Sequence, residues 1–352
     1  MSERASAPRP TLAAVAGRAG VSVSTASLVF SGRGPVADAT RDRVLAAAAE
    51  LDYAGPDPTA RSLRRGSTGV IGVVTEDSLA DTFRDPMNLA LLDGIGEELG
   101  DERLGLLVIP RASDGIDLAA APVDAAILLG CSTDIAPSVA ALRRRRVPVI
   151  AIEAVPIEDA VAVDLDNREA TRRGAELLHG LGHRRVAIIT LPMDAARSRG
   201  EVTAERIAES AASTTLQRLA GARDVFPDAP AHSAGGSTID EGARAAHGLL
   251  DAPAGDRPTA IIAQSDLLAV GVLREAERLG IVVPRDLSVL GFDGVRLEGA
   301  TSHVLTTLVQ PAVEKGRAAA AAALAELAGR RGRPVLLHCE LRTGTTTAPP
   351  AG

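Results

Sequence analysis

The stretch Thr11–Gly32, TLAAVAGRAGVSVSTASLVFSG, decides the fold of the first part of the chain. Between Leu12 and Ala19, apolar residues recur at i, i+3, i+4 and i+7, which predicts a short amphipathic helix. Thr11 is a suitable N-cap for this helix, and Gly20 can adopt the positive φ that a tight turn requires. Ser22 then caps a second predicted helix.

The second helix has an inner and an outer face. Ala26 and Val29 are predicted to face a core, and the outward residues are Val23, Ser24, Ser27 and Leu28. A third segment, residues 38–51, forms a supporting helix. This layout is typical of a helix-turn-helix module, whose second helix enters the major groove of DNA. An Ala-rich helical pair of another function has the same spacing, so the spacing alone leaves DNA binding open.

A short basic segment follows the three helices. The sequence PDPTARSLRRG, residues 56–66, places one apolar residue, Leu63, among arginines. A linker has no need of that leucine, whereas a protein that binds the minor groove inserts such a side chain between base steps. The segment therefore favours DNA binding.

Charge is distributed unevenly along the 352 residues. Residues 1–66 carry nine arginines and six acidic residues, whereas the whole chain has a net charge of −7. A basic head on an acidic body fits a nucleic-acid-binding module attached to another domain. The excess is too small to decide the function by itself.

From residue 68 onward, strand-like runs alternate with helical stretches. GVIGVVT, LGLLVIP, VDAAILLG and VPVIAIE form one series, and RRVAIIT, TAIIAQS and LSVLGFD form a second. This alternation predicts parallel sheets built from βαβ units. Two such series predict two lobes, with a small ligand bound where the carboxyl ends of the strands converge.

Other functional classes find little support in the sequence. The six histidines are scattered, and the chain has no GxSxG, Walker or HExxH motif, so we expect no enzyme. Cys131 and Cys339 are isolated, which predicts free thiols without a metal or cofactor. The start of the chain has no apolar signal region and no run of 18 apolar residues, so we expect a cytoplasmic, nucleoid-associated protein with no membrane contact.

The chain resembles the LacI/GalR family of bacterial transcriptional regulators. The similarity runs through TLAAVAGRAGVSVSTAS, TRDRVLAAAAELDY and ARSLRRGSTGVIGVV, and continues through LGHRRVAII, QSDLLAVGVL, GIVVPRDLSVLGFD, LTTLVQP and LRTGTTTAPP. These motifs occur in the order and spacing of the family and cover essentially the whole chain.

The resemblance implies roles for residues in the first part of the chain. Val23 and Ser24 would meet base edges, and Thr25 and Ser27 would lie close to phosphate. Ala60 and Leu63 would lie on a hinge helix. The full candidate DNA-binding set is Thr11, Ser22, Val23, Ser24, Thr25, Ser27, Leu28, Ala60, Leu63 and Arg64. Leu28 stands where many members carry a base-reading arginine, so the operator sequence is left open.

The resemblance also implies a fold class: an all-α helix-turn-helix domain with a hinge helix, then a two-lobed α/β clamshell like that of periplasmic binding proteins. The expected domains are residues 1–56, the hinge 57–66 and the effector-binding and dimerisation domain 67–352. Lobe 1 is expected at about 67–164 and 295–329, and lobe 2 at about 165–294 and 330–347. The chain would cross between lobes near residues 163–167, 293–297 and 329–334.

A candidate effector site follows from the strand ends and from the resemblance. Asp293, Ser265 and Asp266 each follow a predicted strand, and Asp266 could equally cap a helix. Arg218 matches the family's effector-binding arginine, and Thr214 would share its helical face. Phe83 and Ser237 lie near positions where relatives stack an aromatic ring on the ligand. The candidate set is Phe83, Thr214, Arg218, Ser237, Ser265, Asp266 and Asp293.

The predicted function is that of a DNA-binding regulator, a repressor, controlled by a sugar or related metabolite that binds between the two lobes. It would bind a pseudo-palindromic operator as a homodimer, because one recognition helix makes too few contacts to be specific. The alternative is a solute-binding protein of a transporter, which shares the clamshell but requires a secretory signal and has no use for residues 1–66. The Arg-rich segment 193–213 is left open as a surface helix or a lid.

Overall fold

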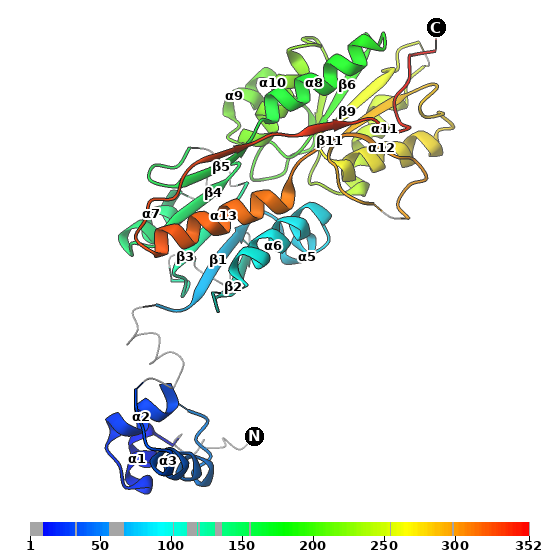
Figure 1. The fold of residues 1–352 in the computed structure, drawn as a ribbon. Coiled ribbons are helices and arrows are strands. Elements are labelled where there is room, and N and C mark those ends of the chain that lie inside the picture. Colours follow the sequence, from blue (N-terminus) through cyan, green and yellow to red (C-terminus); the bar gives the residue numbers. More distant parts are fainter. Residues whose placement is uncertain are drawn as a thin grey trace, which may run out of the picture. The chain divides into compact units, whose positions relative to one another are not determined.

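The computed structural model describes residues 10–31, 34–55, 67–100, 102–110, 118, 120–130, 136–154, 156–253, 255–297 and 299–351. The chain divides into two compact units, residues 1–68 and 69–352 (Figure 1). The predicted hinge, with Ala60, Leu63 and Arg64, lies outside the described residues.

Unit 1 contains three helices, α1 (Leu12–Ala19), α2 (Val23–Ser31) and α3 (Asp38–Glu50), as the sequence predicts. The first two helices are bent by 107° relative to each other, an angle typical of a helix-turn-helix. Small side chains let the helices approach closely. The buried residues of this core are Val15, Ala16, Ala26, Val44, Ala47 and Ala48.

The helices α1 and α2 begin at the capping residues that the sequence indicates, and α1 ends at the predicted glycine. Thr11 Oγ1 accepts a hydrogen bond from the backbone nitrogen of Ala14 at 3.2 Å, which caps α1. Gly20 has a φ of 66° and ends α1 in the left-handed region, where glycine has no steric penalty. Ser22 Oγ accepts from the nitrogen of Thr25 at 3.0 Å and caps α2.

Two β-sheets, one parallel and one mixed, form the framework of unit 2. Sheet A is entirely parallel, in the order β12 (Val335–Leu337), β5 (Val161–Leu165), β4 (Val149–Ile152), β3 (Ala125–Leu129), β1 (Val70–Thr75) and β2 (Gly105–Pro110). Its central strands are buried apolar runs, as expected when helices cover both faces. We call sheet A and its helices lobe 1.

Sheet B is mixed. Its order is β13 (Glu340–Arg342), β11 (Thr306–Val309), β10 (Ser288–Asp293), β9 (Ala260–Ala263), β6 (Val186–Thr190), β8 (Ala231–Ser233) and β7 (Gly200–Glu201). The outermost pairs, β11 with β13 and β7 with β8, are antiparallel, and the other pairs are parallel. We call sheet B and its helices lobe 2.

Helices pack in pairs beside the sheets. In lobe 1, α6 (Pro86–Leu99) lies against α13 (Ala312–Leu327), and α5 (Leu79–Thr82) and α7 (Ala136–Arg144) complete the set (Figure 1). In lobe 2, α8 (Asn167–Gly180) pairs with α10 (Ser213–Arg223), and α11 (Ile239–Leu250) pairs with α12 (Asp266–Arg278).

The α6–α13 contact depends on two glycines. A Cβ at Gly94 would lie 2.0 Å from the carbonyl oxygen of Val313, and a Cβ at Gly316 would lie 2.2 Å from that of Leu91. The two helix backbones therefore touch directly. Because α13 carries Lys315 next to Gly316, this packing also fixes the position of Lys315 relative to sheet A.

The chain passes between the lobes three times: at Asp166, between β11 and α13, and between β12 and β13. The second and third passages differ from the expectation. Residues 306–309 were expected in lobe 1 but pair with β10 in lobe 2, and residues 335–337 were expected in lobe 2 but pair with β5 in lobe 1. Each passage therefore occurs one strand later than expected, because β11 and β12 are short and weakly patterned.

Within the described ranges, no single helix is long and apolar enough to cross a membrane, and α1 with α2 meets that criterion only as a sharply bent pair. The segment 193–213, left open by the sequence, consists of a loop, strand β7 and the short helix α9 (Ala204–Glu209).

Candidate functional site

A cavity of about 220 Å³ lies between the two lobes of unit 2. Lobe 1 contributes residues that follow β1, β3 and β4 or lie on α6 and α13, and lobe 2 contributes residues that follow β6, β9 and β10 or lie on α10. The carboxyl ends of the strands of both sheets therefore meet here, which is where small ligands bind in such folds. Among the described residues that line it, none is aromatic.

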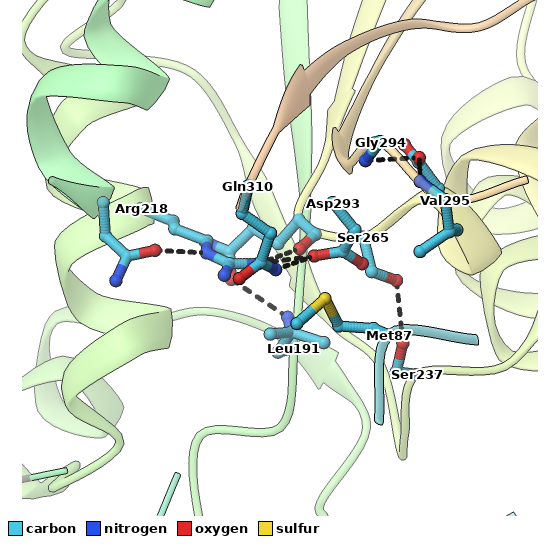
Figure 2. Close-up of polar contacts among 12 residues, drawn as sticks. Met87, Leu191, Arg218, Ser237, Ser265, Asp293, Gly294, Val295 and Gln310 are labelled. Atoms are coloured by element: carbon cyan, nitrogen blue, oxygen red, sulfur yellow. Dashed lines mark hydrogen bonds and ion pairs between the residues drawn. The ribbon is translucent and has the colours of Figure 1, made fainter. Parts of the chain in front are cut away.

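Arg218 on α10 is the central cation of the cavity. Its side chain is buried, with Nε donating to Asn167 Oδ1 at 2.8 Å and Nη1 donating to the carbonyl oxygen of Gln264 at 2.6 Å. The guanidinium lies 3.5 Å from the centre of the Phe292 ring, and Asp293 Oδ1 lies 3.6 Å from Nη1. Figure 2 shows Arg218 pointing toward Asp293 and Gln310. Packing and hydrogen bonds together hold the guanidinium in one orientation.

A second buried ion pair lies beside Arg218. Lys315 Nζ donates hydrogen bonds to Glu153 Oε2 and Gln310 Oε1, and Asn167 Nδ2 donates to Glu153 Oε1 at 2.7 Å. Burial alone would raise the pKa of Glu153, but the charges of Lys315 and Arg218 outweigh it and hold that pKa below its usual value. Glu153 is therefore an ionised carboxylate between two cations.

Two further carboxyl groups of the cavity behave in the opposite way. Burial raises the pKa of Asp293 to about 7, although Arg218 opposes the shift. Burial also raises the pKa of Asp85 to about 7, and the negative charge of Asp293 adds to that effect. Asp85 is on lobe 1 and Asp293 on lobe 2, so the two lobes bring like charges together.

Three residues that line the cavity have left-handed backbones although none is glycine. The φ values are 114° for Asp293, 50° for Glu153 and 54° for Arg197. Such conformations cost free energy and concentrate at functional sites, where the surrounding structure enforces them. Their presence marks the cavity as the candidate site of unit 2.

Five of the seven residues expected in the effector site line the cavity: Thr214, Arg218, Ser237, Ser265 and Asp293. Ser237 Oγ donates to Ser265 Oγ at 2.9 Å (Figure 2), and Ser265 Oγ accepts from the nitrogen of Leu268, so Ser265 caps α12. Thr214 Oγ1 donates to the carbonyl oxygen of Glu153 at 3.2 Å and so connects the lobes.

The other two expected residues lie outside the cavity lining. Asp266 is fully buried, and its carboxylate accepts from the backbone nitrogens of Gly294 and Val295 and from Thr307 Oγ1 at 2.6 to 3.0 Å. Its role in the structure is to join β10 to β11. Phe83 follows α5 and is 52% exposed, and it is not among the residues that line the cavity.

Sequence reasoning missed much of the polar lining of the cavity. Glu153, Gln310, Lys315, Asp85, Asp77 and Arg197 also line the cavity. Glu153 follows the strand run VPVIAI and could have been found by the rule that identified Asp293. Lys315 carried a different signal, since it is the only lysine in a chain whose other basic residues are arginine.

Unit 1 presents a second candidate surface, on the N-terminal part of α2. Val23 is 50% exposed and Leu28 is 40% exposed, although both are apolar, and Ser24 is exposed beside them. Ser27 is half-buried. Thr25 is also half-buried, and its hydroxyl lies 2.8 Å from that of Ser22. The outward residues predicted for the second helix therefore do lie at the surface, apart from Ser27.

Family models match both units of the chain. Residues 11–55 match the family model for bacterial regulatory proteins of the lacI family, and residues 175–347 match a periplasmic binding protein-like domain. The chain is 32% identical to the HTH-type transcriptional regulator IpsA of Corynebacterium glutamicum, covering 96% of this chain and 98% of that protein. It is 31% identical to the HTH-type transcriptional repressor CytR of Escherichia coli, covering 97% of each.

A solved structure matches nearly the whole chain. The complex of the transcriptional regulator CelR with cellobiose matches with a TM-score of 0.67 and 26% identity, covering 96% of this chain and all of the CelR chain. The match therefore includes both units and the α/β clamshell.

Proposed function

Since the chain belongs to the LacI family of bacterial regulatory proteins, we propose that it is a cytoplasmic transcriptional repressor. It binds operator DNA through unit 1, and a small effector in the cavity of unit 2 controls that binding. The observation that carries the proposal is the combination, in one chain, of an exposed helix-turn-helix surface and a polar cavity between two lobes.

The exposed part of α2 supports the DNA-binding role. Val23 and Ser24 lie at the start of the helix, the part that meets base edges in this class of module. An apolar side chain such as Val23 or Leu28 can contact the methyl group of thymine. An exposed ion pair of 2.6 Å joins Arg18 of α1 to Glu50 of α3, on helices other than α2.

The charges of the cavity favour a neutral ligand. Six carboxyl groups line it against three basic groups, and each basic group is already paired: Lys315 with Glu153, Arg218 with Asp293 and Arg197 with Asp77. An anionic ligand would have to displace these carboxylates and would meet like charge. Hydroxyl groups of a polyol can instead donate to the carboxylates. We therefore propose a neutral sugar or related polyhydroxylated metabolite as the effector.

A homodimer is the form in which such a module reads DNA. One recognition helix buries too little surface for specificity, so two copies on a pseudo-palindromic operator are required. The hinge sequence, which lies outside the described residues, supplies the second element of the proposal. Leu63 enters the minor groove at the operator centre, and Arg64 contacts phosphate.

Mobility shift of the intact protein with DNA from upstream of its own gene tests the proposal. At low salt we expect a retarded complex that survives excess nonspecific DNA. A protein that shifts no fragment of that region, while it still binds a sugar, would instead act as a solute-binding protein, and the proposal would be wrong.

A further inference from the structure

One arginine of lobe 2 reaches across the mouth of the cavity. Arg197 Nη2 lies 2.6 Å from Asp77 Oδ1 and donates to the carbonyl oxygen of Glu76 at 3.2 Å. Glu76 and Asp77 follow β1 in lobe 1, whereas Arg197 lies in the loop between β6 and β7 in lobe 2. All three residues line the cavity.

The contact between Arg197 and Asp77 lies away from the strands at which the chain crosses between the lobes. The crossing strands β5 and β12 lie together at one edge of sheet A, and β1 lies three strands from β5. In sheet B, the crossing strands β11 and β13 lie at one edge, and the loop that carries Arg197 connects strands toward the other edge. The pair therefore joins the lobes on the side remote from the crossovers, where opening separates them most.

Among the described residues, two other hydrogen bonds between the lobes lie next to the crossovers. Glu153 receives them from Asn167 and Thr214, and Glu153 is paired through its backbone with β5 at Val163, beside the passage at Asp166. Contacts so near the crossovers change little when the lobes rotate about them. In the part of the chain that the structure describes, the Arg197 contact is the side-chain hydrogen bond between the lobes that lies farthest from the crossovers, so rotation strains it most.

The loop that carries Arg197 is firmly held by lobe 2. Arg206 donates to the carbonyl oxygens of Ser198, Gly200 and Glu201, and Asp194 Oδ1 accepts from the nitrogen of Ser198 at 3.0 Å. These hydrogen bonds hold in place the backbone that carries Arg197. The φ of Arg197 is 54°, a left-handed conformation that the surrounding loop has to enforce.

We propose that Arg197 and Asp77 form a latch that holds the two lobes closed over the cavity when no effector is bound. This role rests on the proposed function of the cavity as the effector site. Both side chains are partly exposed, Arg197 by 36% and Asp77 by 29%, so an entering ligand can reach them. An effector that takes over one partner would release the other and change the separation of the lobes.

Lys315 makes the latch measurable without DNA or effector. It is the only lysine, it is 2% exposed, and it lies in the cavity. Reductive methylation with formaldehyde and a borane modifies only amines, so its rate at Lys315 reports how often the cavity opens. The N-terminal amine of the same molecule serves as the internal standard, and mass spectrometry separates the two products.

We expect Arg197→Gln and Asp77→Asn each to raise the modification rate of Lys315 by roughly three- to fivefold, the upper part of the range for one partly exposed ion pair. The matched control is Arg168→Gln, which removes a bidentate pair with Asp224 inside lobe 2. It should leave the rate within a factor of two. The double variant Asp77→Arg with Arg197→Asp should restore the original rate.

Equal rates in Arg197→Gln and the unaltered protein would overturn the latch. Equal acceleration in Arg168→Gln would also overturn it, since a general loosening of the lobes would then be the cause. Neither result touches the proposed function, because DNA binding by unit 1 is measured separately.

Discussion

Glu153 of lobe 1 forms an ion pair with Lys315 and accepts a hydrogen bond from Asn167 of lobe 2 at 2.7 Å. One carboxylate thus anchors the only lysine of the chain and joins the two lobes beside a crossover. All three side chains are buried. The hydrogen bonds of Glu153 consequently form a fixed polar network beside the crossover. The partly exposed pair of Arg197 and Asp77 joins the lobes on the other side of the cavity.

Glu153→Gln should destabilise the protein because it leaves the ammonium of Lys315 buried without a carboxylate. Breaking one partner of a buried pair costs about 3 kcal/mol. The matched control is Glu97→Gln, which removes an exposed pair with Arg317 between α6 and α13 and should cost less than about 1 kcal/mol. Urea unfolding measures both changes, and equal costs would show that the buried pair contributes no more than the surface one.

Asp85→Asn tests the raised pKa in the cavity. The folded-state pKa of about 7 exceeds the ordinary value of 3.8, so the folded protein holds a proton that the unfolded chain loses. The stability that Asp85 contributes is present at low pH and is lost as the pH rises through about 7. The asparagine variant keeps the cap to Met87, so its stability relative to the unaltered protein should rise by about 1–3 kcal/mol between pH 5 and pH 8.

A surface aspartate provides the control for this titration. A hydrogen bond from Arg285 lowers the pKa of Asp286 to about 2, so Asp286 is ionised throughout that range of pH. Asp286→Asn should therefore change stability by the same amount at pH 5 and pH 8. A pH-independent effect of Asp85→Asn as well would contradict the account of the cavity.

The fold was predictable where the local pattern was strong. Capping by Thr11, the turn at Gly20 and the apolar spacing of α1 and α2 agree, and the structure confirms those helices. Long buried strands such as β3 and β10 were found for the same reason. Short strands of three or four residues, such as β11 and β12, carry no such signal. Their sheet is decided by distant partners, and the second and third crossovers were therefore misplaced.

The candidate site shows a similar division. Asp293 was found because it follows a strong strand, and Arg218 because of the family resemblance. Lys315 lies in the first turn of an Ala-rich helix, and it reaches the cavity because Gly316 lets α13 contact α6. Arg197 lies in a loop whose backbone is held by hydrogen bonds from Arg206 and to Asp194, and it reaches the cavity from there. Neither placement depends on nearby residues alone, so sequence spacing could not reveal it.

Arg218→Ala should uncouple the cavity from DNA. Arg218 lines the cavity and contacts Asn167, Gln264 and the cavity residue Asp293, so its loss removes the centre around which a ligand orders the site. With a ligand found by a thermal-shift screen of neutral sugars and acidic metabolites, we expect operator affinity to become insensitive to that ligand, a loss of roughly 1–3 kcal/mol of coupling. Arg168→Ala, at an exposed arginine of α8, should retain the response in the same anisotropy titration.

Leu63→Ala separates specific from nonspecific DNA binding. Loss of an apolar wedge should weaken binding to the operator at least tenfold, since unstacking and bending would no longer be offset by contacts. Binding to unrelated DNA depends on phosphate contacts and should keep its affinity and its salt dependence. Footprinting and competition with unrelated duplex measure the two, and a parallel loss of both would rule out the wedge.

The most direct measurement compares operator binding by Val23→Glu and Leu45→Glu. Both residues are exposed and apolar, by 50% on α2 and 47% on α3, so each variant adds one carboxylate to unit 1 without disturbing its core. If α2 enters the major groove, Val23→Glu abolishes specific binding in fluorescence anisotropy, while Leu45→Glu retains it. Specific binding by Val23→Glu at the affinity of the unaltered protein would contradict the central claim that this helix reads the operator.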